Sequence, residues 1–335
     1  MQKISVLSAL CVGVCAMALS SATMEAQSLL VVNQGDATVS VVDPVTQQKV
    51  AVIEEKTGNV HGHEITVSPD GKTAYLPIYG STGVGKPGID GHEMFFIDVP
   101  SRTITSRLDF GHGIRPHLPV LDPVSGLLYV TTELDKTVTV IDPKTRKIVG
   151  TVPTGQEQSH MLVLSHDGKL GYTANVGPGT VSVLDLKERK TLAVIPVAGE
   201  VQRISISNDD KLVFTSDYTK PQLVVIDTAT RKVKQTIALP NLGYGSASTK
   251  DGKWLLIAVP QAKQVAVIDL KAMKVARTID VPALPQEVLI RPDDKVAYVS
   301  CNESGQVAAI NLGTWAVQKI ISTSPLADGL GWAKR

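Results

Sequence analysis

A short motif, one apolar residue followed by an acidic one, recurs along nearly the whole chain and constrains its fold more than any other feature. The copies are Val42-Asp43, Ile97-Asp98, Ile141-Asp142, Leu184-Asp185, Ile226-Asp227 and Ile268-Asp269, with Ile310-Asn311 as a variant. Successive copies lie 55, 44, 43, 42, 42 and 42 residues apart. Repeats of this length each form one small unit of secondary structure that packs on its neighbours.

Each repeat predicts four antiparallel strands. The motif ends an alternating segment such as residues 137–141, which is typical of a half-buried strand, and a turn and a further strand at 147–152 follow. Upstream, Asp-Gly turns such as Asp70-Gly71 join two more strands. Four strands per repeat of this length predict an all-β, seven-bladed β-propeller of four-stranded antiparallel blades. Residues 29–53 supply three strands of one blade, and 329–332 supply its inner strand, so pairing of the two ends closes the ring.

The first 26 residues have the layout of a secretory signal peptide. Lys3 precedes an apolar run at 4–19, and small residues follow, with cleavage expected after Ala22 or Ala26. The alternative is a retained membrane anchor, for which the run is short. We therefore expect a signal peptide at 1–26 and an exported propeller at 27–335, periplasmic or extracellular, without a transmembrane span in the mature chain.

Composition excludes several partners and cofactors. With 33 Lys and Arg against 32 Asp and Glu, the chain lacks the basic surplus that nucleic-acid binding needs. Past the signal segment Cys301 is the only cysteine, expected to be a small buried hydrophobe rather than a catalytic thiol, and no Cys-x-x-Cys-His occurs, so no haem c is expected. The segment 83–88 matches G-x-G-x-x-G, but no helical pattern follows it, so no nucleotide is expected either.

Superposition of the repeats places one polar residue per blade at the start of the inner strand, on one face of the ring. These residues are His63, His117, His160, Gln202, Tyr244, Gln286 and Asp328. His61 and His112 lie in adjoining loops and His92 ends a loop on the same face, whereas His166 lies on the opposite face. Six of the seven histidines are thus predicted at the mouth of the central channel.

Neutral imidazoles around one axis suit a divalent transition metal. The predicted metal ligands are His63, His117 and His160, with His61, His92 and His112 as further candidates. Glu133, Asp217, Glu64 or Glu287 would add a ligand or a base. In the alternative interpretation the histidines only hydrogen-bond to backbone in a narrow channel mouth.

A small polar ligand is the other expected occupant of this pocket. Its predicted contacts are Gln202, Tyr244, Gln286, Asp328, Arg115 and Arg203. The two arginines would clamp a carboxylate, unless they are solvated or form salt bridges on the surface. The 55-residue gap reflects an insertion at Tyr79–His92 with five glycines, which is either a lid over the pocket or a tolerated surface loop.

Two repeats carry a resemblance to a known family. The segments Tyr129-Val130-Thr131-Thr132 and Tyr172-Thr173-Ala174-Asn175, each followed by a Thr-Val-x-Val-x-Asp strand, resemble the YVTN repeat of secreted and surface-layer β-propellers. The resemblance covers essentially the whole mature chain and implies the propeller fold. Related propellers include lactonases and the streptogramin lyase, so it leaves the activity open.

These sequence features are compatible with three functions. The first is an exported binding module whose His-rich pocket takes a metal ion or small polar ligand. The second is a metal-assisted hydrolase or lyase with Glu133 or Glu287 as the base. The third is a protein-interaction scaffold at the cell surface, in which the polar ring plays no part.

Overall fold

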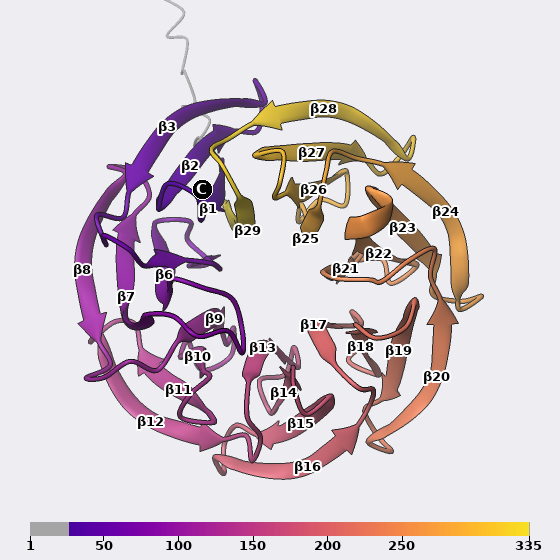
Figure 1. Ribbon diagram of the computed structural model, residues 1–335, viewed down its shortest axis with the longest axis horizontal. Helices are drawn as coiled ribbons and strands as arrows, with labels where there is room; N and C mark the ends of the chain where they lie inside the picture. Colours follow the sequence, from indigo (N-terminus) through magenta and orange to yellow (C-terminus); the bar gives the residue numbers. More distant parts are fainter. Residues whose placement is uncertain (1–26, 335) are drawn as a thin grey trace, which may run out of the picture.

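The computed structural model describes residues 27–334, which form seven sheets around a central axis. Figure 1 looks down that axis and shows the sheets as blades of one ring. The predicted seven-bladed propeller is therefore confirmed. The predicted signal peptide lies outside the described residues.

The blades follow one another along the chain. Blade 1 comprises β29 (Ala327–Ala333), β1 (Ser28–Asn33), β2 (Thr38–Asp43) and β3 (Gln48–Glu54). Blade 2 comprises β4 (His61–Gly62), β5 (Thr66–Val67), β6 (Thr73–Gly80), β7 (Asp90–Asp98) and β8 (Thr103–Asp109). Blade 3 comprises β9 (Pro116–Leu121), β10 (Leu128–Thr132), β11 (Thr137–Asp142) and β12 (Lys147–Pro153).

Blades 4 to 7 repeat the pattern. Blade 4 comprises β13 (Ser159–Leu164), β14 (Leu170–Asn175), β15 (Thr180–Asp185) and β16 (Lys190–Pro196), and blade 5 comprises β17 (Val201–Ile206), β18 (Leu212–Asp217), β19 (Gln222–Asp227) and β20 (Lys232–Ala238). Blade 6 comprises β21 (Ser246–Ser248), β22 (Trp254–Val259), β23 (Gln264–Asp269) and β24 (Lys274–Asp280), with the 3-10 helix η1 (Pro260–Ala262). Blade 7 comprises β25 (Pro285–Ile290), β26 (Val296–Cys301), β27 (Gln306–Asn311) and β28 (Ala316–Ser322).

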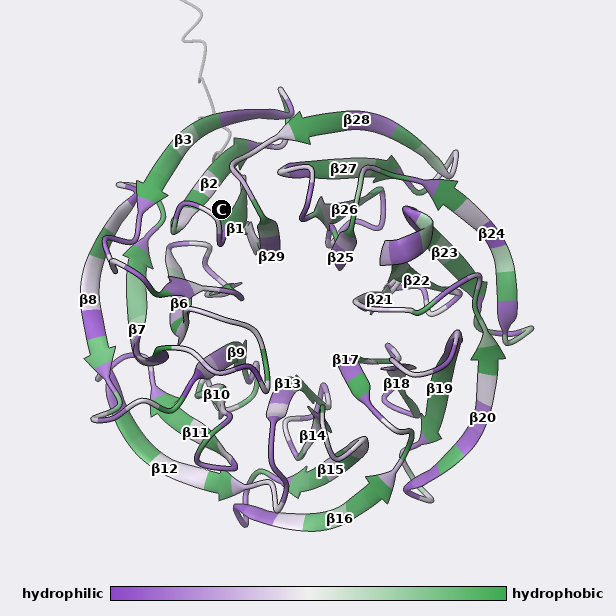
Figure 2. Ribbon diagram, in the orientation of Figure 1, coloured by the Kyte–Doolittle hydropathy of each residue, from purple (hydrophilic) through white to green (hydrophobic). Residues whose placement is uncertain are grey.

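The core lies between blades rather than within any one of them. Leu30 and Val41 of blade 1 pack with Leu76 and Phe95 of blade 2 in one apolar cluster. The middle strands are covered on both faces, and Figure 2 shows much of their length coloured as hydrophobic. This explains one difference from the sequence prediction: residues 137–141 alternate as if one face met water, yet Thr139 is buried too, because a neighbouring blade covers it. Within residues 27–334, no helix has the length and apolar character needed to cross a membrane.

Pairing of the last strand with the first closes the ring. β29 runs antiparallel to β1, with Leu29 opposite Trp332 and Leu30 opposite Gly331. This confirms the predicted closure, and it pairs two strands whose free edges would otherwise be open to other chains.

A bulge interrupts the inner strand of most blades near the channel mouth. In blade 5 the pair Gln202-Arg203 lies opposite the single residue Ser216, and in blade 7 Gln286-Glu287 lies opposite Ser300. Blades 1, 3 and 4 have register shifts at the same level. A bulge re-aims a side chain that regular pleating would turn elsewhere. The polar ring therefore occupies the positions where the inner strands depart from regular pairing.

The closure leaves no room for a side chain at Gly329. A Cβ there would meet the carbonyl oxygen of His63 at 2.4 Å, and the Gly329 amide donates to that same oxygen at 2.9 Å. We predict that Gly329→Ala lowers the free energy of unfolding by about 1–3 kcal/mol, the usual cost of overpacking. Thermal and denaturant unfolding measure the change. Gly83→Ala is the matched control, because its added Cβ would meet nothing within 4 Å; equal stability of the two variants would contradict the tight closure.

Candidate functional site

A cavity of about 790 Å³ lies at the mouth of the central channel. It is bounded by the starts of the inner strands and by the loops between second and third strands, which we call the mouth face. The predicted ring residues that line it are His61, His63, His117, His160, Gln202, Arg203, Tyr244, Gln286 and Asp328. The sequence superposition therefore placed most of its candidates correctly, and the volume suits a small-molecule site.

Four imidazoles form a continuous cluster on one side of this cavity. The ring centroids of His61 and His63 are 5.0 Å apart, those of His63 and His117 are 5.4 Å apart, and those of His117 and His160 are 3.7 Å apart. Tyr79 packs against three of these rings, with its centroid 4.5 Å from that of His63 and 5.0 Å from that of His117. Blades 2, 3 and 4 thus bring together side chains nearly a hundred residues apart.

These imidazoles are neutral and incompletely hydrogen-bonded. Burial lowers the pKa of His63 and of His117 well below the ordinary histidine value, and it also lowers that of His160. One buried ring nitrogen in each of the four has no hydrogen-bond partner within the described chain: Nδ1 of His61, His117 and His160, and Nε2 of His63. Unpaired buried nitrogens are costly, so this cluster is arranged for something other than its own stability.

The predicted three-histidine metal site is not preformed. Among residues 27–334 no group of three or more His, Cys, Asp or Glu side chains is placed to hold a metal ion. The physical reason is the ring geometry: His117 and His160 stack with only 29° between their planes, so their nitrogens do not converge on one point. Zinc-type coordination needs ligand atoms directed at a common centre.

Glu133 orients one histidine of the cluster. Its Oε2 lies 3.5 Å from Nδ1 of His160 and accepts a hydrogen bond from the Tyr79 hydroxyl. Burial would raise the pKa of Glu133, but His160 and Tyr79 together hold it below its ordinary value, so the carboxylate is charged. A carboxylate at Nδ1 favours the tautomer that leaves Nε2 as the acceptor or ligand atom.

Arg203 spans the channel beneath the histidines. Its Nη1 is 2.5 Å from Glu64 Oε1 in blade 2, and its Nη2 is 3.0 Å from Asp328 Oδ1 in blade 1. Asp328 also accepts a hydrogen bond from Gln34 at 2.5 Å. All these groups except Gln34 are buried. Burial opposes charge on Arg203, yet Glu64 and Asp328 raise its pKa well above the ordinary value.

One guanidinium faces three carboxyl groups, because the partly buried Glu287 lies beside the buried Glu64. Burial raises the pKa of Glu287 to about 7, that of Asp328 to about 7, and that of Glu64 well above its ordinary range. The cluster therefore holds protons that isolated carboxyl groups would have lost at neutral pH.

Arg115 does not line the channel cavity but fastens the insertion loop. Its Nε is 2.5 Å from Asp90 Oδ1, and its Nη2 donates to the carbonyl oxygen of Lys86 at 2.8 Å. The loop residues Ser81 to Lys86 line one wall of the cavity. Both arginines bind carboxylates of the chain itself, which agrees with the salt-bridge alternative of the sequence analysis, except that the pairs are not on the surface.

Several other predicted residues lie away from the cavity. His92 bonds to Asp109 at 3.0 Å and His112 to Asp135 at 2.9 Å, both exposed, and neither lines the site. Neither Glu133 nor Glu287, the two predicted bases, is among the residues that line this cavity. Cys301 is fully buried, as predicted, and burial raises the pKa of its thiol to about 12.

The site also holds residues that the sequence analysis did not single out. Gln34, Tyr218 and Glu200 line the cavity, and Tyr79 supports the imidazoles from behind. Gln34 and Tyr218 lie in the loops that follow the second strands of blades 1 and 5, and the insertion loop is the corresponding loop of blade 2. A superposition that included these loops would have found both residues.

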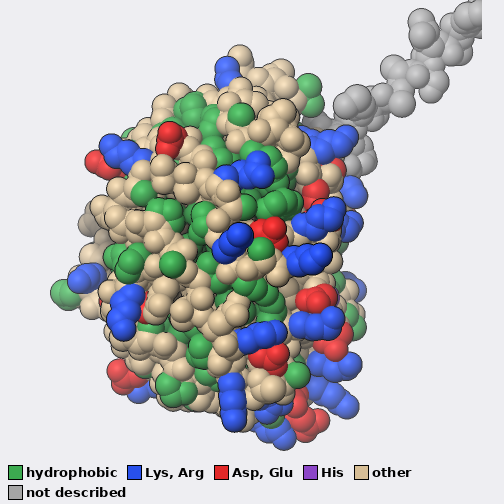
Figure 3. Space-filling view, turned by 90° about the vertical axis from the view of Figure 1, so that its right-hand side faces the viewer, with side chains coloured by type: hydrophobic (Ala, Val, Ile, Leu, Met, Phe, Trp, Pro, Cys, Tyr) green, Lys and Arg blue, Asp and Glu red, His purple; other side chains and the backbone are tan. Residues whose placement is uncertain are grey.

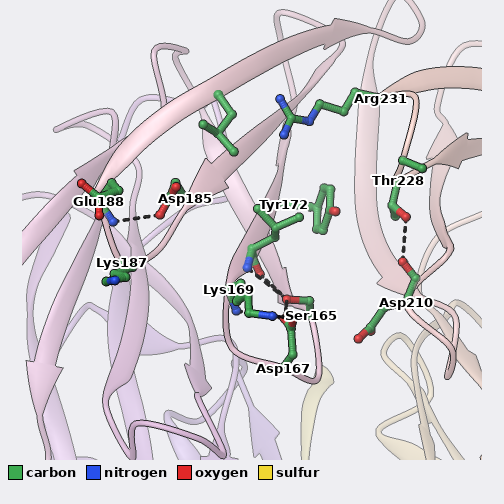
Figure 4. A pocket seen from close by; sticks show the side chains of 13 residues that line it. Ser165, Asp167, Lys169, Tyr172, Asp185, Lys187, Glu188, Asp210, Thr228 and Arg231 are labelled. Carbon is green, nitrogen blue, oxygen red and sulfur yellow. Dashed lines mark hydrogen bonds and ion pairs between the residues drawn. The ribbon is translucent and has the colours of Figure 1, made fainter.

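A second cavity, of about 600 Å³, opens on the opposite face between blades 4 and 5 (Figure 4). Its Ser165 and Lys169 both bond to Asp167, Asp185 accepts from the Glu188 amide, and the backbone carbonyl of Asp210 accepts from the Thr228 hydroxyl. No buried side-chain atom without a partner belongs to the residues that line it. The mouth face is therefore the better candidate site.

Fold and site together define a seven-bladed β-propeller with a histidine-rich cavity at its channel mouth. A family model described as the cytochrome D1 heme domain matches residues 124–247, which is less than half of the chain. A solved structure described as Kuenenia stuttgartiensis hydrazine synthase superposes with a TM-score of 0.72 over 85% of this chain and 92% of that chain, at 19% sequence identity. Comparison with curated proteins gives no significant match. At this identity the structural likeness shows the fold alone, and the YVTN resemblance stays a prediction.

These comparisons overturn the cofactor prediction. A transition metal ion was expected and haem c was excluded, but the matched model is that of a haem domain. The absence of Cys-x-x-Cys-His excludes only thioether attachment, because a haem held without covalent bonds needs an axial side chain and a cavity. A haem supplies four of its own nitrogen ligands to the iron, so one directed imidazole suffices where three do not converge.

The carboxyl cluster predicts a specific pH dependence of stability. Because the pKa of Glu287 is raised in the folded state to about 7, folding loses stability as pH rises from about 4.5 through 7 and the buried carboxyl ionises. Glu287→Gln removes this loss. We expect the melting temperature of the variant, relative to the wild type, to increase across that range and to level off above it.

Differential scanning calorimetry at a series of pH values measures this difference. Glu303→Gln, an exposed carboxylate on the same face, is the control and should give a flat difference. A difference for Glu287→Gln that does not change with pH would show that the cluster does not hold its proton.

Proposed function

We propose that this protein binds a small ligand at the mouth of its channel through an imidazole nitrogen, and that a non-covalently held, haem-type group is the ligand. The observation that carries the proposal is the cluster of four buried imidazoles at one cavity of about 790 Å³, in which Nδ1 of His160 lies 3.5 Å from a carboxylate oxygen and its other ring nitrogen is left for a ligand. The unpaired nitrogens of His61, His63 and His117 fit a group that offers them a hydrogen-bond partner.

His160 is the residue that fits axial ligation. Glu133 and Tyr79 hold it from the Nδ1 side, which leaves Nε2 for an iron atom. The segment that matches the haem-domain model contains both Glu133 and His160. When bound, a haem would supply redox or small-gas chemistry at its open axial position.

The remaining lining is mixed, which suits an amphipathic macrocycle. Tyr218, Tyr244, Val84, Val176 and Leu326 offer aromatic and apolar contacts. Lys86, in the insertion loop, is the lining cation with no ion pair in the described chain, because Arg203 is bound to Glu64 and Asp328. We place the protein outside the cytoplasm on the strength of the signal-like segment 1–26.

Titration of the purified protein with hemin tests this proposal. We expect saturable binding of one equivalent, with a shifted Soret band in the absorption spectrum. His160→Ala should weaken binding at least about tenfold, since second-shell and ligand substitutions at such sites cost about 10–100-fold. His92→Ala is the matched control, because His92 is an exposed histidine on the same face.

A second variant separates ligation from cavity shape. Glu133→Gln keeps the size of the side chain and removes its charge, so it should change the Soret position while the cavity stays intact. Binding that is non-saturable, or equal in His160→Ala and the wild type, would overturn the proposal.

A further inference from the structure

The face opposite the cavity carries a distinct set of charges. We call it the hairpin face, because it bears the hairpins that join first to second strands and third to fourth strands. Both kinds of hairpin contain lysine, but the two kinds differ in how that charge is balanced.

In the inner hairpins, between first and second strands, lysine is neutralised locally. Lys169 pairs with Asp167 at 2.8 Å, Lys211 with Asp209 at 3.1 Å, and Lys253 with Asp251 at 3.0 Å. In each case the partner lies two residues earlier in the same turn. These hairpins contribute little net field.

In the outer hairpins of blades 3 to 6 the cations outnumber the carboxylates and form no ion pair in the part of the chain that is described. We call this set the basic arc, and all of its members are exposed: Lys144, Arg146, Lys147, Lys187, Arg189, Lys190, Arg231, Lys232, Lys234, Lys271 and Lys274. The same turns contain only Asp142, Asp185, Glu188, Asp227 and Asp269. The four aspartates accept backbone hydrogen bonds within their turns rather than pairing with the cations.

The mouth face of the same blades shows no such excess of cations. Its acidic residues Glu133, Asp135, Glu157, Glu200, Asp217 and Asp280 stand against Arg115, Lys136, Arg203, Lys220 and Lys263. Figure 3 views the ring from the side of β20 and β24 and shows many Lys and Arg side chains toward one face, with Asp and Glu side chains among them. In blades 3 to 6 the excess of cations therefore lies on the hairpin face and not on the mouth face.

We propose that the basic arc docks the propeller on an anionic lipid surface, with the cavity mouth facing away from it. Each exposed Lys or Arg near such a surface contributes about 1 kcal/mol, and the contributions act together over a broad, ring-shaped face. Arg231 and Lys187 border the cavity of Figure 4, so a headgroup phosphate can be met at the centre of the arc as well as at its rim.

Vesicle co-sedimentation of the protein, purified as its host processes it, tests the docking. We expect binding to vesicles of phosphatidylglycerol mixed with phosphatidylcholine that weakens as salt rises, and much weaker binding to phosphatidylcholine alone. The variant Lys144→Glu/Lys187→Glu/Lys232→Glu, one change per blade, should lower affinity for the mixed vesicles at least about tenfold.

The control reverses the same number of charges on the mouth face, as Lys56→Glu/Lys220→Glu/Lys263→Glu. It should bind vesicles within about twofold of the wild type, because these positions lie beyond a Debye length from a lipid surface at the hairpin face. Equal losses in both triple variants would show an effect of net charge alone and overturn the proposal. Binding to heparin or polyphosphate without binding to anionic vesicles would overturn it as well and assign the arc to a soluble polyanion. Lys190→Glu/Lys234→Glu, a second arc variant, guards against a folding defect in the first.

Discussion

The pairing of β29 with β1 is the contact on which the rest of the structure depends. A propeller blade buries its faces only when it has a neighbour on each side, so an open array would leave two apolar faces in water. The seven residues of β29 complete blade 1 and bring Asp328 to the channel. Closure therefore fixes the ring and one wall of the site in a single step, which is why Gly329 is packed against the backbone of His63.

Closure of the ring also brings several ionisable side chains together inside the channel. The inner strands of blades 1, 2, 5 and 7 direct Asp328, Glu64, Arg203 and Glu287 to one buried region. Removal of these groups from water is costly unless they are paired and hydrogen-bonded. Arg203 reaches across the channel and pairs with two of the carboxyl groups. Because there are more carboxyl groups than cations, the carboxyl groups remain partly protonated. The floor of the cavity is thus a network in which each charge depends on residues from the far side of the ring.

The fold could be predicted from the sequence because every repeat has the same local pattern. In each one a turn residue, an apolar strand and an Asx turn follow at a fixed spacing. The identity of the mouth residues followed from the same register. Their orientation did not follow, because it is set by bulges such as that at Gln202-Arg203, which a regular strand pattern does not reveal. The superposition therefore found His117 and His160 but could not show that they stack, and it left open whether Arg115 and Arg203 form salt bridges, which both do.

Comparison of equivalent positions in the seven repeats shows which residue types the fold requires and which it does not. At the position after each ring residue, blades 3, 4, 6 and 1 carry Leu118, Met161, Gly245 and Gly329, whereas blades 2, 5 and 7 carry Glu64, Arg203 and Glu287. Since an uncharged residue suffices in four blades, the architecture does not demand charge at this position. At the repeat position that Tyr79 and Glu133 occupy in blades 2 and 3, blades 4 and 5 carry Val176 and Tyr218, so the fold requires no charge there either. Some buried side chains break the sevenfold pattern and converge on the channel mouth, and the fold does not require them. The chemistry of the site therefore depends on these side chains rather than on the propeller fold.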